Sequence, residues 1–460
     1  MALPIKVGFN PVRNFESMKS KQHGFQLDRI LLSLLWIFVW QPAEKIQAQT
    51  SLFASLPSET YPIEISFKPT NNPAFASDTV LLLPFQLEVA RLPEAGPVKP
   101  LDRRKQNPTL SIRNGKEQLP LRFVGMSDSG HERWELPYFQ SELWFMQKDD
   151  AVTGFWKRVD RDQSYPLTLI LNRHSRFPVD PGNKSNSIYL APRYQLKMIH
   201  PIDSTDVQEA VAILEKTSDG QIHGTFLTES GDYRYLSGVR TGNRLQLSTF
   251  NGVFAYLVDL QLSEDGFEGW IHYGASFSHR LVAVANEKAA LKNPEHLTQF
   301  TAESGVFSLE LPHYQEPRWF KFTPGKVTIV QIMGSWCPNC LDETRLFNYF
   351  HQQYANQGLQ LVAISFERFQ EKEKAFPMID KFVRDLSIPY PVLFGGKASH
   401  DQVQKVLPGL TGFQAYPTTL FVDKKGTVRK IHTGFSGPAT PHYDQYVLKT
   451  SQFIEQLMQE

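Results

Sequence analysis

The chain of 460 residues contains only two cysteines, Cys337 and Cys340, and they lie three positions apart. No disulfide framework can therefore hold its domains together, so each domain must bury a hydrophobic core of its own. At about 150 residues per domain, the length predicts two or three such cores. The composition, with 41% hydrophobic residues, 31 prolines and 28 glycines, is typical of a globular chain rich in turns. We therefore expect a folded, multidomain protein.

The net charge of the chain is close to zero. Lysine and arginine number 48 in total, against 47 for aspartate and glutamate. Such a chain has no overall field that would attract phosphate backbones or anionic lipids. We therefore expect no nucleic acid among its partners.

The N-terminal segment has the layout of a secretory signal peptide. Residues 30–40, ILLSLLWIFVW, form an apolar run between basic and polar flanks. The run is shorter than the roughly 20 residues that a helix needs to cross a bilayer. We expect residues 1–48 to be a signal peptide that is cleaved near Ala48, which predicts export to the periplasm or cell envelope. Met18 is the alternative start. An uncleaved segment would instead anchor the chain in the membrane, and a buried element of a cytoplasmic fold is a further alternative.

Residues 50–285 read as a mostly β accessory region. Short runs of Leu, Val and aromatic residues alternate there with turn dipeptides. Asn114-Gly115, Asp219-Gly220 and Asp265-Gly266 predict hairpins, because Asn or Asp followed by Gly tolerates the positive φ angles of tight turns. Residues 286–300 are polar and contain a proline, which favours a linker.

Three segments of this region place a glycine beside a bulky aromatic residue, around Gly154, Gly224 and Gly269. In a strand, this pairing favours a packing role in which a ring covers the bare backbone. The alternative is a platform for a sugar or peptide, formed by exposed Trp134, Trp144, Trp156 or Trp270.

Residues 301–460 change to alternating strands and amphipathic helices, a pattern typical of an α/β domain. The sequence predicts strands at 327–333, 359–366, 390–394, 418–422 and 427–433, and helices at 340–357, 375–386, 401–406 and 443–458.

Both cysteines belong to the segment Gly334-Ser335-Trp336-Cys337-Pro338-Asn339-Cys340, where a predicted buried strand ends and a helix begins. The first cysteine of such a pair meets the unpaired N–H groups and the positive end of the helix, which favour its thiolate. We therefore expect Cys337 to be the nucleophile. Cys340, one turn later and facing inward, would attack the mixed disulfide that Cys337 forms, and is the expected resolving residue. Pro338 suits the first turn, where its missing N–H is not needed.

Half of a zinc site is the alternative for a single C-x-x-C pair, because structural zinc binds four Cys or His ligands. The chain has no second cysteine pair, and His351 is isolated on the following helix. Zinc would therefore need another subunit. We expect neither a metal nor another cofactor.

The cysteine segment resembles the active site of the TlpA-like thiol-disulfide oxidoreductases, which are thioredoxin-fold members of the AhpC/TSA and redoxin superfamily. The resemblance extends to Ala415-Tyr416-Pro417-Thr418-Thr419, which is similar to the cis-proline strand of that family, whose proline faces the cysteine pair. A cis X-Pro bond is rare, and it turns a backbone edge outward beside the sulfurs, where a substrate chain can pair. An ordinary trans proline that opens an edge strand is the alternative. The resemblance implies a thioredoxin-like α/β domain at 301–460.

Glu367 matches the place where these proteins often carry an acid near the active site, which could exchange a proton with the resolving thiol. An exposed carboxylate at a strand end is the alternative. The dipeptide between the cysteines is Pro-Asn, and because dipeptide identity helps to set the potential, the resemblance does not fix the reducing strength. The residues expected to support the site or to contact the substrate are Trp336, Pro338, Asn339, Tyr416, Pro417 and Glu367.

The leading hypothesis is a thiol-disulfide oxidoreductase of the cell envelope. It would reduce protein or small-molecule disulfides through Cys337 and Cys340, and a membrane electron donor would re-reduce it, or an acceptor would reoxidise it if it acts as an oxidase. The first alternative is a thioredoxin-fold peroxidase, although peroxiredoxins carry a threonine three residues before the reactive cysteine and Gly334 stands there. The second is an envelope binding protein whose β-rich region is the main functional module.

Overall fold

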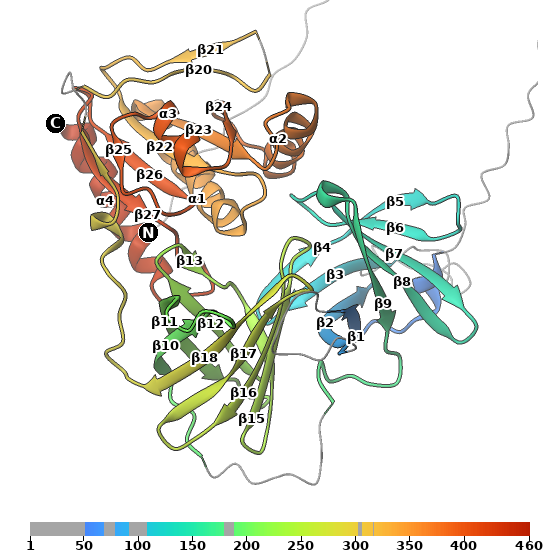
Figure 1. The fold of residues 1–460 in the computed structure, drawn as a ribbon. Coiled ribbons are helices and arrows are strands. Elements are labelled where there is room, and N and C mark those ends of the chain that lie inside the picture. The colour runs from blue at the N-terminus through green and yellow to red at the C-terminus, as the bar shows by residue number, and fades with distance from the viewer. Residues whose placement is uncertain (1–50, 69–78, 92–107, 179–187, 302–305, 316) are drawn as a thin grey trace, which may run out of the picture. The chain divides into compact units, whose positions relative to one another are not determined.

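Two large antiparallel sheets are formed by strands between Thr60 and Ala285, and a third, mixed sheet follows them (Figure 1). This computed structural model describes residues 51–68, 79–91, 108–178, 188–301, 306–315 and 317–460. The expected signal peptide lies outside the described residues. Among the helices of the described ranges, none combines the length and the apolar character that a membrane span requires.

The first sheet has the strand order β4-β3-β2-β1-β9-β8-β7-β6-β5. Its strands alternate buried and more exposed side chains, as in β7, where Leu143 and Phe145 face the core. The elements are η1 (Leu52–Ser55), β1 (Thr60–Phe67), β2 (Leu81–Ala90), β3 (Thr109–Asn114), β4 (Glu117–Pro120), β5 (Arg122–Met126), β6 (Glu132–Glu135), β7 (Ser141–Lys148), β8 (Ala151–Arg158), η3 (Val159–Arg161) and β9 (Gln163–Leu169).

The second sheet has the order β11-β10-β18-β17-β16-β15-β14-β12-β13. Strand β11 also pairs with β12, so this sheet closes on itself around a hydrophobic core. Its strands are β10 (Arg193–Ile199), β11 (Val207–Lys216), β12 (Ile222–Thr228), β13 (Gly231–Asp232), β14 (Leu236–Thr241), β15 (Arg244–Phe250), β16 (Ala255–Leu262), β17 (Gly266–Tyr273) and β18 (Phe277–Ala285).

The third sheet contains five strands in the order β24-β23-β22-β26-β27. Strand β22 (Val327–Met333) is central and buried along its whole length. It runs parallel to β23 (Leu359–Glu367) and antiparallel to β26 (Thr418–Val422). Strand β24 (Val392–Lys397) pairs in parallel with β23, and β27 (Val428–Thr433) pairs in antiparallel fashion with β26.

Apolar cores lie on both faces of the third sheet. The helices α1 (Pro338–Tyr354), α2 (Lys372–Leu386) and α4 (Tyr443–Gln459) contribute to the core on one face, and α3 (His400–Val406) contributes to the other. The remaining elements of this part are η4 (Pro294–His296), β19 (Gln299–Phe300), β20 (Glu310–Pro312), β21 (Trp319–Lys321), η5 (Ala355–Gln357) and β25 (Leu410–Thr411). Because β19 pairs with β25, the end of the expected linker already joins the C-terminal region.

The three turn dipeptides all mark hairpins, but they act differently. Gly115 and Gly220 adopt positive φ angles of 56° and 85° in their turns, as predicted. Gly266 instead opens β17, where a Cβ would lie 1.9 Å from the carbonyl oxygen of Ala283. Close approach of two backbones, and not turn conformation, requires glycine at that position.

The glycines beside aromatic residues are also sites of close backbone approach. A Cβ at Gly154, Gly224 or Gly269 would lie 1.8, 2.3 or 2.1 Å from a carbonyl oxygen of the neighbouring strand. Trp134 and Trp156 are each 3% exposed within the first core, so they cannot form the platform considered above.

Residues 50–460 form one compact unit. Phe139 and Val253, which belong to the β-rich part, lie in the same hydrophobic cluster as both cysteines. On α2, the buried ammonium group of Lys381 lies 3.0 Å from the carboxylate of Glu135. The β-rich region therefore packs directly against the C-terminal region.

Candidate active site

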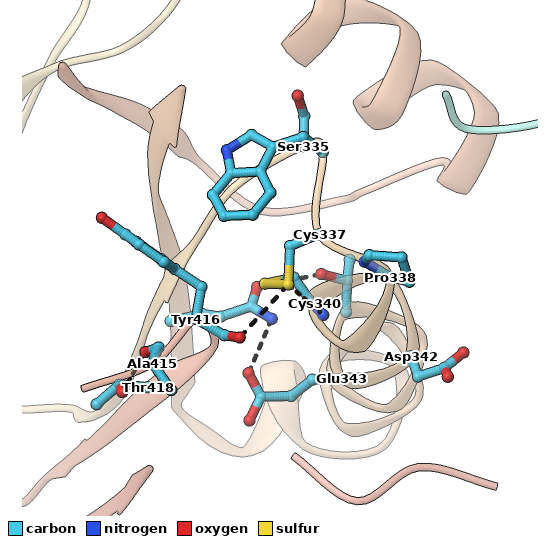
Figure 2. Close-up of a disulfide and its surroundings, with 12 residues drawn as sticks. Ser335, Cys337, Pro338, Cys340, Asp342, Glu343, Ala415, Tyr416 and Thr418 are labelled. Carbon is cyan, nitrogen blue, oxygen red and sulfur yellow. Dashed lines mark hydrogen bonds between the residues drawn. A yellow bond between two sulfur atoms is a disulfide. The ribbon is translucent and has the colours of Figure 1, made fainter. Parts of the chain in front are cut away.

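Cys337 and Cys340 lie where β22 gives way to α1, and a disulfide joins them (Figure 2). Their Cα atoms are 5.2 Å apart. Cys337 is the N-cap of α1, and Pro338 occupies the first turn. The strand-to-helix position and the place of the proline are as the sequence predicted.

The helix start presents a backbone donor to the first sulfur. The N–H of Cys340 donates to Sγ of Cys337 over 3.2 Å. Such a donor, together with the positive end of the helix, stabilises a thiolate at Cys337. Cys337 is 5% exposed, whereas Cys340 is fully buried. The geometry therefore distinguishes an outer, anion-stabilised sulfur from an inner one.

The peptide bond between Tyr416 and Pro417 is cis, in agreement with the expectation from the sequence. The carbonyl oxygen of Tyr416 points toward the disulfide in Figure 2 and lies 3.5 Å from Sγ of Cys337. It can accept a hydrogen bond from Cys337 when this residue is a thiol. The two sequence segments singled out for the site therefore meet in space.

Trp336 packs between the cysteine loop and the cis-proline loop. Its indole Nε1–H donates to the carbonyl oxygen of Phe366 over 3.0 Å. Its ring makes an edge contact with Tyr416, with centroids 5.6 Å apart. The guanidinium of Arg368 lies over the indole ring of Trp336, 5.3 Å from its centroid. These contacts fix the residue that precedes Cys337.

Glu367 is the last residue of β23 and is fully buried, so its reading as an ordinary surface carboxylate is wrong. Its carboxylate accepts hydrogen bonds from the N–H and hydroxyl of Ser335, at 3.0 and 2.7 Å, and from the hydroxyl of Ser365. Burial raises the pKa of Glu367, although these donors oppose the rise. Among the hydrogen bonds of the described residues, none joins this carboxylate to a sulfur. Its contacts support a role in holding the loop that leads to Cys337.

A second buried acid, Glu343, was not anticipated from the sequence. It lies on α1, and it accepts hydrogen bonds of 2.9 Å from the side chains of Gln331 and Thr419. Burial raises the pKa of Glu343 to about 8. The sequence feature that could have indicated Glu343 is its position three residues after Cys340, because residues three apart share one side of a helix. Figure 2 shows it on the side of α1 nearer the disulfide, whereas Asp342 points elsewhere.

The β-rich region also contributes to this site, and nothing in the spacing of the sequence indicated it. Arg234, in the segment between β13 and β14, donates to the carbonyl oxygen of Pro338 over 3.1 Å. The same guanidinium pairs with the carboxylates of Asp342 on α1 and Glu117 on the first sheet. Each of these side chains is 6% exposed or less. One cation thus joins both β-sheets to the redox helix.

Asp232 completes this buried cluster. Its carboxylate accepts from the N–H of Gly437 and from the N–H of Arg234, both at 2.5 Å. Burial, followed by the nearby charge of Asp342, raises the pKa of Asp232 to about 6.

A cavity of about 340 Å³ adjoins the disulfide, with Cys337 in its wall. Of the residues predicted to support the site, Trp336, Pro338, Asn339 and Tyr416 line this cavity. Pro417 is buried and is not among the residues that line this cavity, and Glu367 contacts the cysteine loop through Ser335. Within the described ranges, no group of three or more His, Cys, Asp or Glu side chains could hold a metal ion.

Residues 306–431 match the model of the AhpC/TSA family. The chain is 27% identical over 110 residues to the thiol-disulfide oxidoreductase ResA of Geobacillus thermodenitrificans. This alignment covers 24% of this chain and 56% of that protein. It is 25% identical over 113 residues to the thiol:disulfide interchange protein DsbE of Pasteurella multocida, covering 25% of this chain and 54% of that protein. The chain thus spans little more than half of the length of either relative.

Among solved structures, a thiol:disulfide interchange protein of the thioredoxin family from Chlorobium tepidum is similar to this chain at 17% sequence identity. It covers 37% of this chain and 99% of its own length, with a TM-score of 0.25. The family match includes the segment that holds the cysteine pair. Residues 306–431 therefore resemble the AhpC/TSA family, and the chain is similar to proteins named thiol-disulfide oxidoreductases.

Proposed function

We propose that this protein is a thiol-disulfide oxidoreductase that reduces disulfides through Cys337 and Cys340. The single observation that carries the proposal is the asymmetry of the pair. The outer sulfur caps a helix and receives a backbone hydrogen bond, while the inner sulfur is fully buried one turn later. The similarity to proteins named thiol-disulfide oxidoreductases supports the same chemistry.

In the proposed reaction, the Cys337 thiolate attacks one sulfur of a substrate disulfide. A bond forms between the two sulfurs, and the other half of the substrate leaves as a thiolate, which takes up a proton. Cys340, as a thiolate, then attacks Sγ of Cys337 and releases the second half of the substrate as a thiolate. The substrate gains two electrons and the cysteine pair becomes a disulfide, which a dithiol donor must reduce again.

Glu343 is buried on the same helix as Cys340 and accepts hydrogen bonds from Gln331 on β22 and Thr419 on β26. Burial raises its pKa to about 8, so Glu343 holds a proton near neutral pH and joins the redox helix to the sheet. Glu367, through Ser335, instead supports the position of the loop before Cys337.

A single-turnover experiment tests this function. The full chain is reduced, separated from reductant and mixed with the disulfide of N-acetylcysteine methyl ester. We expect one equivalent of that disulfide to be reduced per chain, while the mass of the protein falls by two hydrogens as the internal disulfide forms. A Cys337→Ser variant should reduce none. Equal consumption of the disulfide by this variant would refute the proposed role of the pair.

The direction of electron flow is tested by the reduction potential. A value near that of thioredoxin, roughly −270 mV, is expected for a reductase, whereas a value near about −120 mV would reverse the assignment to an oxidant. We further propose that the protein acts in the periplasm or cell envelope and receives its electrons from a membrane donor. The basic and apolar pattern of the N-terminal residues supports export, and mass spectrometry of the native protein, which would show cleavage near Ala48, tests it.

A further inference from the structure

The cavity beside Cys337 has two walls that come from distant parts of the sequence. One wall belongs to the C-terminal region and includes Trp336, Asn339 and Tyr416. The other belongs to the second β-sheet. It consists of the β12–β14 tip, which we define as residues 228–234, together with residues of β15 and β16 such as Tyr256. The reactive sulfur therefore faces a partly open cavity between these two walls.

The β12–β14 tip is fixed tightly against the cysteine motif. Gly231 lies so close to it that a Cβ at this position would be 2.2 Å from Nδ2 of Asn339 and 2.5 Å from the carbonyl oxygen of Phe435. Gly231 also forms a β-bridge with Phe435. At the other end of the tip, Arg234 bonds to Pro338 and Asp342. Displacing the tip would break this buried ion pair, which is costly because it leaves charges unpaired in the interior.

Such a wall restricts what can reach the sulfur. A compact protein docks through a broad patch, typically about 800 Å² on each partner. In this chain the β12–β14 tip covers the surface next to Cys337 that such a patch would have to contact. A cavity of about 340 Å³ instead has the size of a small-ligand pocket. We propose that the β12–β14 tip is a specificity element, an inference that rests on the proposed function and extends it. The tip limits the substrate to slender disulfides, carried on a small molecule or an extended peptide segment.

The lining also indicates the chemistry of the groups beside the substrate disulfide. Aromatic rings come from both walls, among them Tyr233 and Phe254 on one side and Phe413 on the other. The charges of Asp232 and Arg234 are already engaged by protein partners. The cavity thus presents rings and neutral polar groups, which favour an uncharged substrate with apolar neighbours.

A matched set of substrates tests the size limit in the full chain. The same 2-pyridyl disulfide is placed on three carriers: N-acetylcysteine methyl ester, an unstructured peptide with a central cysteine, and a single surface cysteine of a folded protein. Release of 2-thiopyridone gives the rate at which the protein reacts with each carrier. This rate is divided by the rate at which dithiothreitol reacts with the same carrier, which removes differences in intrinsic reactivity. We expect the folded carrier to react at least about tenfold more slowly than the better of the other two.

Gly231→Ala tests the role of the tip. The Cβ of the new alanine would collide with Asn339, so the substitution should push the tip away from the cysteine motif. The rate with the folded carrier should then approach the rates with the ester and the peptide. Gly220→Ala is the matched control. It lies in a turn of the same sheet and has a similarly positive φ of 85°, but a Cβ there meets nothing within 4 Å. This control should keep the discrimination of the parent chain.

The outcomes separate the inference from the function on which it rests. Reaction with none of the three carriers, in a chain whose two thiols can be titrated, would overturn both. Equal rates with all three carriers, or unchanged discrimination in a folded Gly231→Ala variant, would overturn the specificity element alone. A preference for the ester identifies a small-molecule disulfide, and a preference for the peptide identifies an extended segment of a protein.

A second measurement does not depend on whether Gly231→Ala folds. In a Cys340→Ala background, Cys337 is the only thiol of the chain. We expect iodoacetamide to modify it readily, and a maleimide attached to a folded carrier to modify it only after denaturation. Equal modification of the native chain by both reagents would show that no wall restricts access, and would refute the proposal.

Discussion

The guanidinium of Arg234 donates a hydrogen bond of 3.1 Å to the carbonyl oxygen of Pro338, the residue that immediately follows Cys337. A side chain of the β-rich region is therefore attached to the first turn of the redox helix. This attachment makes the accessory region part of the site, and not a passive neighbour of it.

Arg234→Met is expected to lower the free energy of unfolding by about 3–5 kcal/mol, because it leaves the buried carboxylate of Glu117 without its cation and Asp342 with only the more exposed Arg345. Urea denaturation measures the effect. The control is Arg244→Met, which removes the pair with Asp259 at a site where the arginine side chain is 57% exposed. That loss should stay within about 1 kcal/mol. Similar losses in the two variants would mean that the buried cluster does not stabilise the fold.

The two cysteines should not be interchangeable. Cys340→Ala should still attack disulfides but fail to release them, so that mixed disulfides accumulate and disappear on addition of a strong reductant. Cys337→Ser should trap nothing, because the remaining sulfur is fully buried. Intact-mass measurement and a non-reducing gel of both variants, purified from cells, make the comparison for small and large partners. Equal trapping by the two would remove the assignment of nucleophile and resolver.

Glu343 should make stability depend on pH. Its pKa is raised from 4.5 to about 8 in the folded chain, so the folded state keeps a proton that the unfolded state has lost. Unfolding therefore releases a proton between these values, and stability falls as the pH rises through this window. Glu343→Gln, which stays neutral, should flatten this decline in urea titrations at several pH values. Glu310→Gln, on an exposed strand, should leave the decline unchanged.

Glu367→Ala should weaken the loop that leads to Cys337. The change leaves the buried N–H and hydroxyl of Ser335 without their acceptor, which costs about 1–3 kcal/mol for each unsatisfied group. We expect a lower urea midpoint and a slower single turnover. The exposed Glu371, changed to Ala, serves as the control. Normal turnover in a destabilised Glu367→Ala chain would limit this residue to a structural role.

The order of elements in the C-terminal region followed from local patterns. The expected strands at 327–333 and 418–422 have the same bounds as β22 and β26, because each is a short run rich in β-branched and apolar residues. The helix after the cysteines begins at Pro338 and not at Cys340, since the proline belongs to its first turn. The short pair β20–β21 was not predicted, because strands of three residues leave no periodicity to detect.

The cysteine pair and the cis proline could also be recognised from local sequence. The contribution of Arg234 and Gly231 could not, because it depends on how a hairpin tip packs more than 100 residues further along the chain. Burial of Glu367 could not be predicted from the sequence either. A charged residue at the end of a strand gives no local sign that Ser335 will cover it.

The pairing of β11 with β12 closes the second sheet into a ring of strands. Strands β12 and β14, which support the tip, are each hydrogen-bonded to a neighbouring strand on both sides, so sliding either strand would break a ladder of backbone hydrogen bonds. Residues that exchange no electrons therefore form one wall of the cavity beside Cys337. Under the proposed specificity, substitutions in this sheet would change which disulfides reach Cys337 and would leave the two reacting sulfurs unchanged.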